Sequence, residues 1–101
     1  MRYRFRGELW IHTGEAAWYF ITLPAEVADE IDELTAGTRR GFGSVRVTVT
    51  IGETNWGTSI FPDTAAASYL LPVKKQVRMS EDLQDGDAVD VTLELATEPG
   101  G

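Results

Sequence analysis

The sequence predicts a mostly β fold with one amphipathic helix and one short helix, on the strength of three observations. Apolar and polar residues alternate along several runs that are each as long as one strand. Turn residues such as Asp85-Gly86 separate these runs. Only the stretch after Pro24 has the apolar spacing of a helix several turns long. The 101 residues are the size of one domain, which we expect over residues 1–97, followed by a flexible tail over 98–101.

The chain opens with a predicted hairpin. Residues 2–11 alternate with period two, which is typical of a half-buried strand. Turn residues follow, and residues 17–23 are aromatic and β-branched, as in a second strand. Because Trp18 and Phe20 make the second face of this strand apolar too, we expect it to be central or covered. The side chains predicted to face the core are Tyr3, Phe5, Leu9, Ile11 and Tyr19.

A helix is predicted after Pro24, which suits a first helical position. The apolar residues that recur at helical spacing are Val27, Ile31 and Leu34, and acidic residues take most of the positions between them. Gly37 is placed to end the helix. Residues 45–51 then alternate again as a strand, with valines facing one way and polar residues the other.

The elements predicted for the second half of the chain follow the same order as those of the first half. Residues 56–61 form a predicted strand, Pro62-Asp63 breaks it, and residues 68–72 run extended again. One or two helical turns follow, and residues 89–95 alternate as the last strand. Each half contains a Leu-Pro step, a helix, a turn and a strand, which we interpret as shared architecture. Chance similarity between β-rich segments is the alternative.

Composition excludes several chemistries. The chain has no cysteine, which rules out disulfides, thiolate-bound zinc, iron–sulfur clusters and thiol catalysis. A formal net charge of -7 repels phosphate backbones at long range and argues against general nucleic-acid binding. The charged residues near the N-terminus do not resemble a secretion signal, and no apolar run is long enough to span a membrane. We therefore expect a cytoplasmic protein with no membrane partner.

Four segments carry a resemblance to a known family. They read VRVTVTIG at residues 45–52, WGTSIFP at 56–62, YLLPVKKQVR at 69–78 and LQDGDAVDV at 83–91. In this order they resemble the bacterial DUF1905 domains over nearly the whole chain. The resemblance implies a double-split β-barrel, related in shape to the swapped-hairpin barrels of AbrB-like regulators and antitoxins. The function of the family is undefined, and a shared fold does not transfer function.

No arrangement of residues points to catalysis, so we predict no catalytic residue, no metal and no cofactor. An acidic loop contains Glu81, Asp82, Asp85 and Asp87. It fails the EF-hand pattern, because Leu83 and Thr92 stand where carboxylates are required, and we interpret it as a solvated turn. His12 is the only histidine, which leaves zinc without a ligand set. Ser59 lacks the following glycine of a nucleophile elbow.

Localised basic residues and exposed tryptophans are the candidates for binding. A short helix can present the bases of residues 74–78 together, and Trp10 falls on the arginine face of its strand. A glycine-rich loop with two arginines can offer positive charge to an anion. The alternative is that the bases pair with surface acids and the tryptophans cover a barrel end. The predicted binding residues are Trp10, Trp56, Lys74, Lys75, Arg78, Arg39 and Arg40.

The resulting hypothesis is a non-catalytic module that binds a small anionic ligand or a protein partner. One alternative is an AbrB-like DNA-binding regulator, for which Arg39-Arg40 is the best feature and the net charge the worst. Another alternative is a small enzyme that uses carboxylates and His12. AbrB-like barrels combine strand–helix–strand units from two chains, whereas this chain carries two such units itself. We therefore expect a monomer, with a weak dimer as the alternative.

Overall fold

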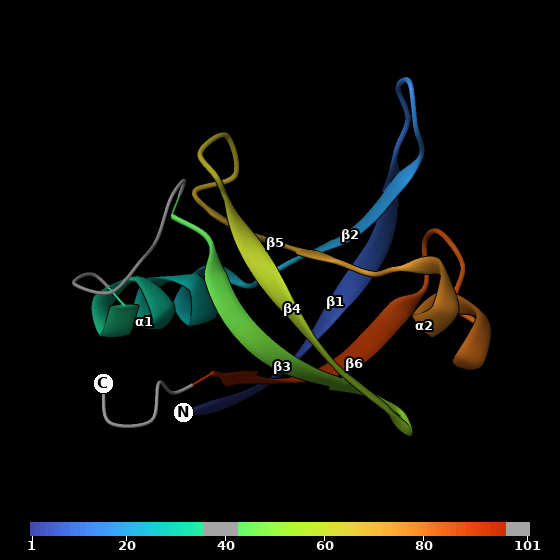
Figure 1. Cartoon of the computed structure of the whole chain (residues 1–101). Helices are drawn as coiled ribbons and strands as arrows, with labels where there is room; N and C mark the ends of the chain where they lie inside the picture. The colour runs from blue at the N-terminus through green and yellow to red at the C-terminus, as the bar shows by residue number, and fades with distance from the viewer. Residues whose placement is uncertain (36–42, 97–101) are drawn as a thin grey trace.

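The computed structural model describes residues 1–35 and 43–96, and its elements follow the order expected from the sequence (Figure 1). The strands are β1 (Arg2–His12), β2 (Trp18–Thr22), β3 (Val45–Ile51), β4 (Thr54–Asp63), β5 (Ser68–Pro72) and β6 (Ala88–Leu95). The helices are α1 (Ala25–Thr35) and α2 (Lys75–Ser80). Gly37, Arg39, Arg40 and the predicted tail lie outside the described residues. Within these residues, neither helix is long and apolar enough to cross a membrane.

The six strands form a closed antiparallel barrel in the order β1-β2-β5-β4-β3-β6. The two longest strands each divide between two neighbours. Residues 2–8 of β1 pair with β6 and residues 9–12 pair with β2. Residues 54–60 of β4 pair with β3 and residues 61–63 pair with β5. The predicted mostly β fold, a double-split barrel with one amphipathic helix and one short helix, is therefore confirmed, and the two helices lie at opposite ends of the barrel (Figure 1).

The strand pairings relate the two halves of the chain by an internal two-fold pattern. β1 pairs with β6 and β2, just as β4 pairs with β3 and β5. In this pattern β2 occupies the same place in the first half as β5 in the second, and β3 the same place as β6. The remaining two pairings, β2 with β5 and β3 with β6, each join two such equivalent strands. The same pattern holds for single hydrogen bonds, because the Leu23 amide donates to the Tyr69 carbonyl at 3.0 Å and the Val73 amide donates to the Tyr19 carbonyl at 2.9 Å. Tyr19 and Tyr69 thus occupy equivalent places.

The core fills the barrel from alternate positions of the strands. The apolar positions of β3 are all buried, as the alternation predicts, and Val89, Val91 and Leu93 of β6 are buried with them. On β1, Tyr3 and Leu9 are buried, whereas Phe5 and Ile11 are half-buried. Tyr19 is also half-buried and packs against the core. The predicted inward faces are therefore correct, but the aromatic residues near the barrel ends are only partly covered.

The buried face of α1 includes Ile31 and part of Val27 from the predicted apolar stripe, but not Leu34. Its buried residues are Ala28, Ile31 and Thr35, whereas Leu34 is 51% exposed. Thr35 tolerates burial because its hydroxyl donates to the Ile31 carbonyl at 2.7 Å, which satisfies the polar group within the helix. The prediction that Leu34 faces the core was wrong, since apolar spacing alone could not choose between two adjacent helix faces.

Pro62 does not end its strand, contrary to the prediction. It lies within β4 opposite Tyr69 of β5. The Tyr69 carbonyl accepts a hydrogen bond from the amide of Leu23, the residue after β2, so the backbone polar groups of Tyr69 point away from β4. No amide donor is needed from the residue opposite, and proline fits the strand at this position without losing a ladder hydrogen bond.

Gly7 is the position in β1 where the barrel leaves no room for a side chain. A Cβ atom added there would lie 2.5 Å from Cγ2 of Ile21, which is fully buried. We expect Gly7→Ala to lower the free energy of unfolding by about 1–3 kcal/mol, because the core must shift to accept it. Gly57→Ala is the control, since its nearest neighbour would be an Arg46 side-chain nitrogen at 3.5 Å. Urea titration checks both, and equal midpoints would contradict the prediction.

Tyr3 places a hydroxyl in the core with no hydrogen-bond partner among the described residues. We expect Tyr3→Phe to raise the free energy of unfolding by about 1 kcal/mol, because it removes an unsatisfied buried group. Urea titration of the variant and the parent chain measures this difference.

The hydroxyl of Tyr3 also makes stability depend on pH. Burial, and to a smaller extent the negative charge of Glu30, raise the pKa of Tyr3 above its ordinary value of 10.0. The unfolded chain therefore loses this proton first, and stability falls as the pH rises above about 10. Denaturant titrations at several pH values should show a smaller decline in Tyr3→Phe.

Candidate functional site

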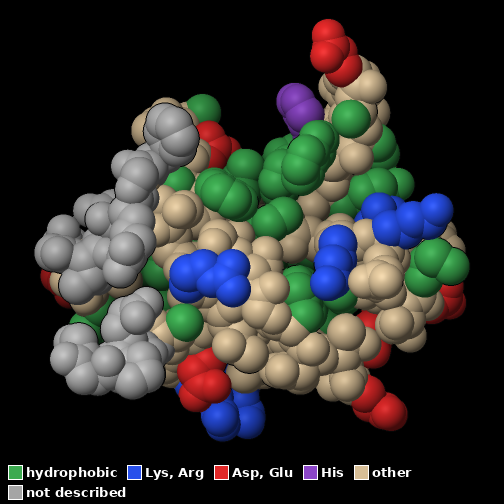
Figure 2. Space-filling view, in the orientation of Figure 1, with side chains coloured by type: hydrophobic (Ala, Val, Ile, Leu, Met, Phe, Trp, Pro, Cys, Tyr) green, Lys and Arg blue, Asp and Glu red, His purple; other side chains and the backbone are tan. Residues whose placement is uncertain are grey.

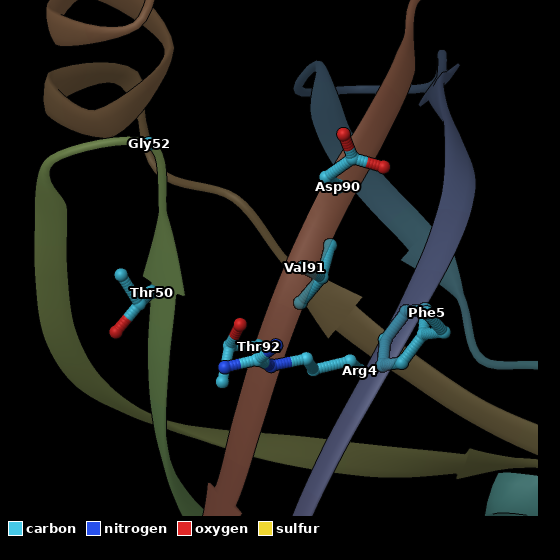
Figure 3. Close-up of a pocket in the computed structure, with 7 residues that line it drawn as sticks. All are labelled: Arg4, Phe5, Thr50, Gly52, Asp90, Val91 and Thr92. Carbon is cyan, nitrogen blue, oxygen red and sulfur yellow. The ribbon is translucent and has the colours of Figure 1, made fainter.

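One surface hollow, with a volume of about 410 Å³, lies along β1, β6 and β3. Figure 3 shows the Arg4 side chain reaching from β1 across Thr92 of β6 toward β3. The neighbouring arginines on this face are paired with acids of β6. Arg6 lies 3.2 Å from Asp90, and Arg2 lies 3.7 Å from Glu94, both in exposed positions. On β1 the structure therefore agrees with the salt-bridge alternative.

The second hollow, with a volume of about 340 Å³, lies at the end of the barrel where α2 sits, and we call it the α2 pocket. Its walls come from three separate parts of the chain. The loop after β1 and the start of β2 form one wall, the first half of β4 forms another, and the junction of β5 with α2 forms the third. The pocket brings together four of the predicted binding residues, which are Trp56, Lys74, Lys75 and Arg78.

The basic wall of the α2 pocket is built by the turn from β5 into α2. Lys74 is extended, and its carbonyl accepts hydrogen bonds from the amides of Val77 and Arg78, which starts the helix. Lys75 and Arg78 are three residues apart on α2 and so share a face. Lys74 and Lys75 are exposed, whereas Arg78 is half-buried. The sequence contains no other lysine, so both lysine side chains lie at this pocket.

Arg78 is held in place on both sides. Its guanidinium carbon lies 3.7 Å from the centre of the Tyr19 ring, which is a cation–π contact. Its Nε donates to the Val73 carbonyl at 3.2 Å, and the Val73 amide in turn donates to the Tyr19 carbonyl. These contacts tie β2 to the start of α2. They leave the terminal guanidinium nitrogens without an acceptor among the described residues.

The aromatic residues divide between the pocket and the outer face of the barrel. Trp18 is 55% exposed at the pocket edge and stacks on Phe20, with ring centres 6.2 Å apart. Trp56 is half-buried and packs against the core. Trp10 lies outside the pocket, where its indole nitrogen donates to the Thr22 hydroxyl at 3.0 Å. Figure 2 shows hydrophobic side chains gathered at the foot of the β1–β2 hairpin, with basic side chains beside them toward α2.

The charges at the α2 pocket are not balanced by neighbouring acids. Within residues 1–35 and 43–96, Lys74, Lys75 and Arg78 have no carboxylate partner at ion-pair distance. The arginines of β1, by contrast, include two that face acids across the β1–β6 pairing. The pairing alternative therefore fits the β1 arginines but not the pocket bases, as far as the described residues extend.

The two-fold pattern shows how the fold opens this pocket. At the other end of the barrel Tyr69 is only 2% exposed, and its hydroxyl donates to Asp32 of α1 at 2.5 Å. Its equivalent, Tyr19, is half-buried and carries Arg78 on its ring. The helix over Tyr69 has 11 residues, whereas the helix near Tyr19 has 6. The shorter helix leaves Tyr19 and Trp56 accessible at the mouth of the barrel.

Comparison with known proteins adds a family and no activity. The model of the family DUF1905, described as a domain of unknown function, matches residues 5–93. The chain belongs to the DUF1905 family. No curated protein matches it. All the residues that line the α2 pocket fall within the matched range, so the pocket is part of the DUF1905 domain.

The other residues that were considered for catalysis or metal binding are His12 and the acids of the loop before β6. His12 of this DUF1905 domain is exposed at the end of β1, opposite Trp18. In the acidic loop, Asp85 accepts from the Ile11 amide, and Asp87 from the Gln84 amide, so both hold turns. The described residues contain no cluster of acids and histidine that could hold a metal ion. Arg39 and Arg40, which were also predicted to bind, lie outside the described residues.

Sequence reasoning missed two aromatic residues of the pocket, Trp18 and Tyr19. Trp18 was assigned only to the second face of its strand, and Tyr19 was assigned to the core. The structure places both at the pocket, because β2 begins at this mouth of the barrel and its first two residues lie next to the loop that forms one pocket wall. The signal was present in the sequence as an aromatic pair directly after a loop of small residues.

Arg78 should contribute more to stability than an arginine on the open face of β1. We expect Arg78→Ala to lower the free energy of unfolding by about 1 kcal/mol, because it loses the ring contact and the bond to Val73. Arg6→Ala is the matched control, and it should change stability by less than about 0.5 kcal/mol because exposed pairs contribute little. Urea titrations of the two variants measure this difference. A larger effect at Arg6 would contradict the assignment.

Proposed function

We propose that this DUF1905 domain is a non-catalytic module that binds a small anionic ligand in the α2 pocket. The observation that carries the proposal is the group of three cations, Lys74, Lys75 and Arg78, around a cavity with aromatic walls. These cations have no carboxylate partner among the described residues. An anion in the pocket would supply the missing negative charge and accept the hydrogen bonds that these side chains can donate.

The size and surroundings of the pocket favour a small ligand over a long one. Its volume of about 340 Å³ is near the lower end for small-molecule sites. The chain as a whole carries a net charge of -7, so a long polyanion would be repelled wherever it extended beyond the pocket. A small anion would meet only the local positive charge. The closed barrel also supports action as a single chain, because its strands already pair with each other.

Thermal unfolding in the presence of small carboxylates, phosphates and sulfates tests the proposal. A ligand at about a hundred times its Kd stabilises a folded state by about 2.7 kcal/mol. For a domain of this size we expect the unfolding midpoint to rise by about 10 °C or more. The double variant Lys74→Ala/Lys75→Ala should weaken binding by roughly tenfold or more, since charge-assisted hydrogen bonds are lost.

The matched control removes the same amount of charge from another face. Arg2→Ala/Arg6→Ala takes two positive charges from β1, where both are paired with exposed acids. It should leave anion binding as it is in the parent chain. NMR gives a second readout, because all lysine side-chain resonances come from the pocket. If no anion raises the midpoint, or if the two double variants lose binding equally, the pocket is not an anion site.

A further inference from the structure

The charged and aromatic walls of the α2 pocket come from different parts of the chain. All three cations belong to residues 74–78, at the start of α2. The rings come from Trp18 and Tyr19 of β2 and from Trp56 of β4. A ligand that fills the pocket therefore meets positive charge on one side and aromatic surface on the other. One end of the ligand must therefore carry negative charge, and the other end must be suited to an aromatic surface.

The aromatic side of the pocket offers few hydrogen bonds. Among the described residues of the lining, Thr58 is the only polar side chain apart from the cations and the polar atoms of the rings. The other lining residues there are small or apolar, among them Ala16, Ala17 and Pro72. A ligand rich in hydroxyl groups would leave those groups without partners after it lost its water, which disfavours sugar phosphates and hydroxy acids.

The arrangement of rings favours a flat body over a bulky one. Arg78 already covers one face of Tyr19, which shows that a planar group fits against this ring. Trp18 lines the pocket as well, is 55% exposed and stacks on Phe20 in a nearly parallel arrangement, with an angle of 7° between the rings. Trp56, in the first half of β4, offers a further ring. Flat unsaturated rings gain stacking contacts with such side chains that puckered rings of similar size do not.

We propose that the ligand of the α2 pocket is a planar aromatic anion, in which an unsaturated ring carries one carboxylate or phosphate group. The anionic group lies against Lys74 and Lys75, and the ring lies toward Trp18 and Trp56. This inference rests on the proposed function and goes beyond it, because binding of anions in general does not require a ring.

Two matched acids test the requirement for a flat ring. Benzoate and cyclohexanecarboxylate have the same charge and nearly the same size, but only benzoate is planar and unsaturated. Titrations followed by tryptophan fluorescence and thermal unfolding should show benzoate binding at least tenfold more tightly. Phenyl phosphate compared with inorganic phosphate tests the same preference for a phosphate head. The better of benzoate and phenyl phosphate indicates which anionic group the lysines accept.

Variants of the tryptophans show whether the pocket rings are responsible. Trp56→Leu keeps an apolar side chain and should reduce the preference for benzoate at least tenfold. Trp18→Leu alters an exposed residue, so it should fold normally and should reduce the preference as well. Trp10→Leu is the control, because Trp10 is half-buried outside the pocket. It should keep the preference of the parent chain.

The outcomes separate this inference from the proposed function. If benzoate and cyclohexanecarboxylate bind equally well, and Lys74→Ala/Lys75→Ala weakens both, the pocket binds anions but the ring requirement is wrong. If the preference for benzoate survives in both Trp18→Leu and Trp56→Leu, the ring lies elsewhere and the inference fails. If none of the four compounds binds and no other small anion does, both the inference and the proposed function are overturned.

Discussion

The fold depends on the way in which two long strands divide their backbone hydrogen bonds. β1 leaves β6 after residue 8 and continues with β2, and β4 leaves β3 after residue 60 and continues with β5. Each strand therefore belongs to both sides of the barrel, and this shared membership closes the barrel without an unpaired edge strand. Gly7 lies next to the first division, where β1 passes so close to Ile21 that no Cβ fits.

The candidate site arises where the two halves of this pattern differ. Both halves place a tyrosine at the second position of a short strand and follow that strand with a helix. The longer helix, α1, covers Tyr69, while the shorter helix, α2, leaves Tyr19 at an open mouth. An almost symmetric barrel can thus keep one end for stability and use the other for binding. Unequal helix length is the physical difference between the two ends.

Positively charged side chains have different surroundings on β1 and at the α2 pocket. Arg2 and Arg6 of β1 lie in register with Glu94 and Asp90 of β6, and these cross-strand neighbours of opposite sign compensate their charges. Lys74 and Lys75 lie at a strand-to-helix junction, where no sheet register brings an acid opposite them. Arg78 is oriented by an aromatic ring and a carbonyl group. Charge that is oriented but not neutralised is available to a ligand.

The sequence by itself determined the order of the elements, the inward faces of the strands and the residues of the basic wall. These features are local, because side chains alternate with period two along any strand and Lys74, Lys75 and Arg78 are close neighbours in the chain. Only the tertiary structure decided that β4 continues through Pro62, because the Tyr69 carbonyl opposite it bonds with Leu23, directly after β2, and not with β4. The aromatic wall was decided in the same way, since its rings come from β2 and β4, and barrel closure brings these distant strands together.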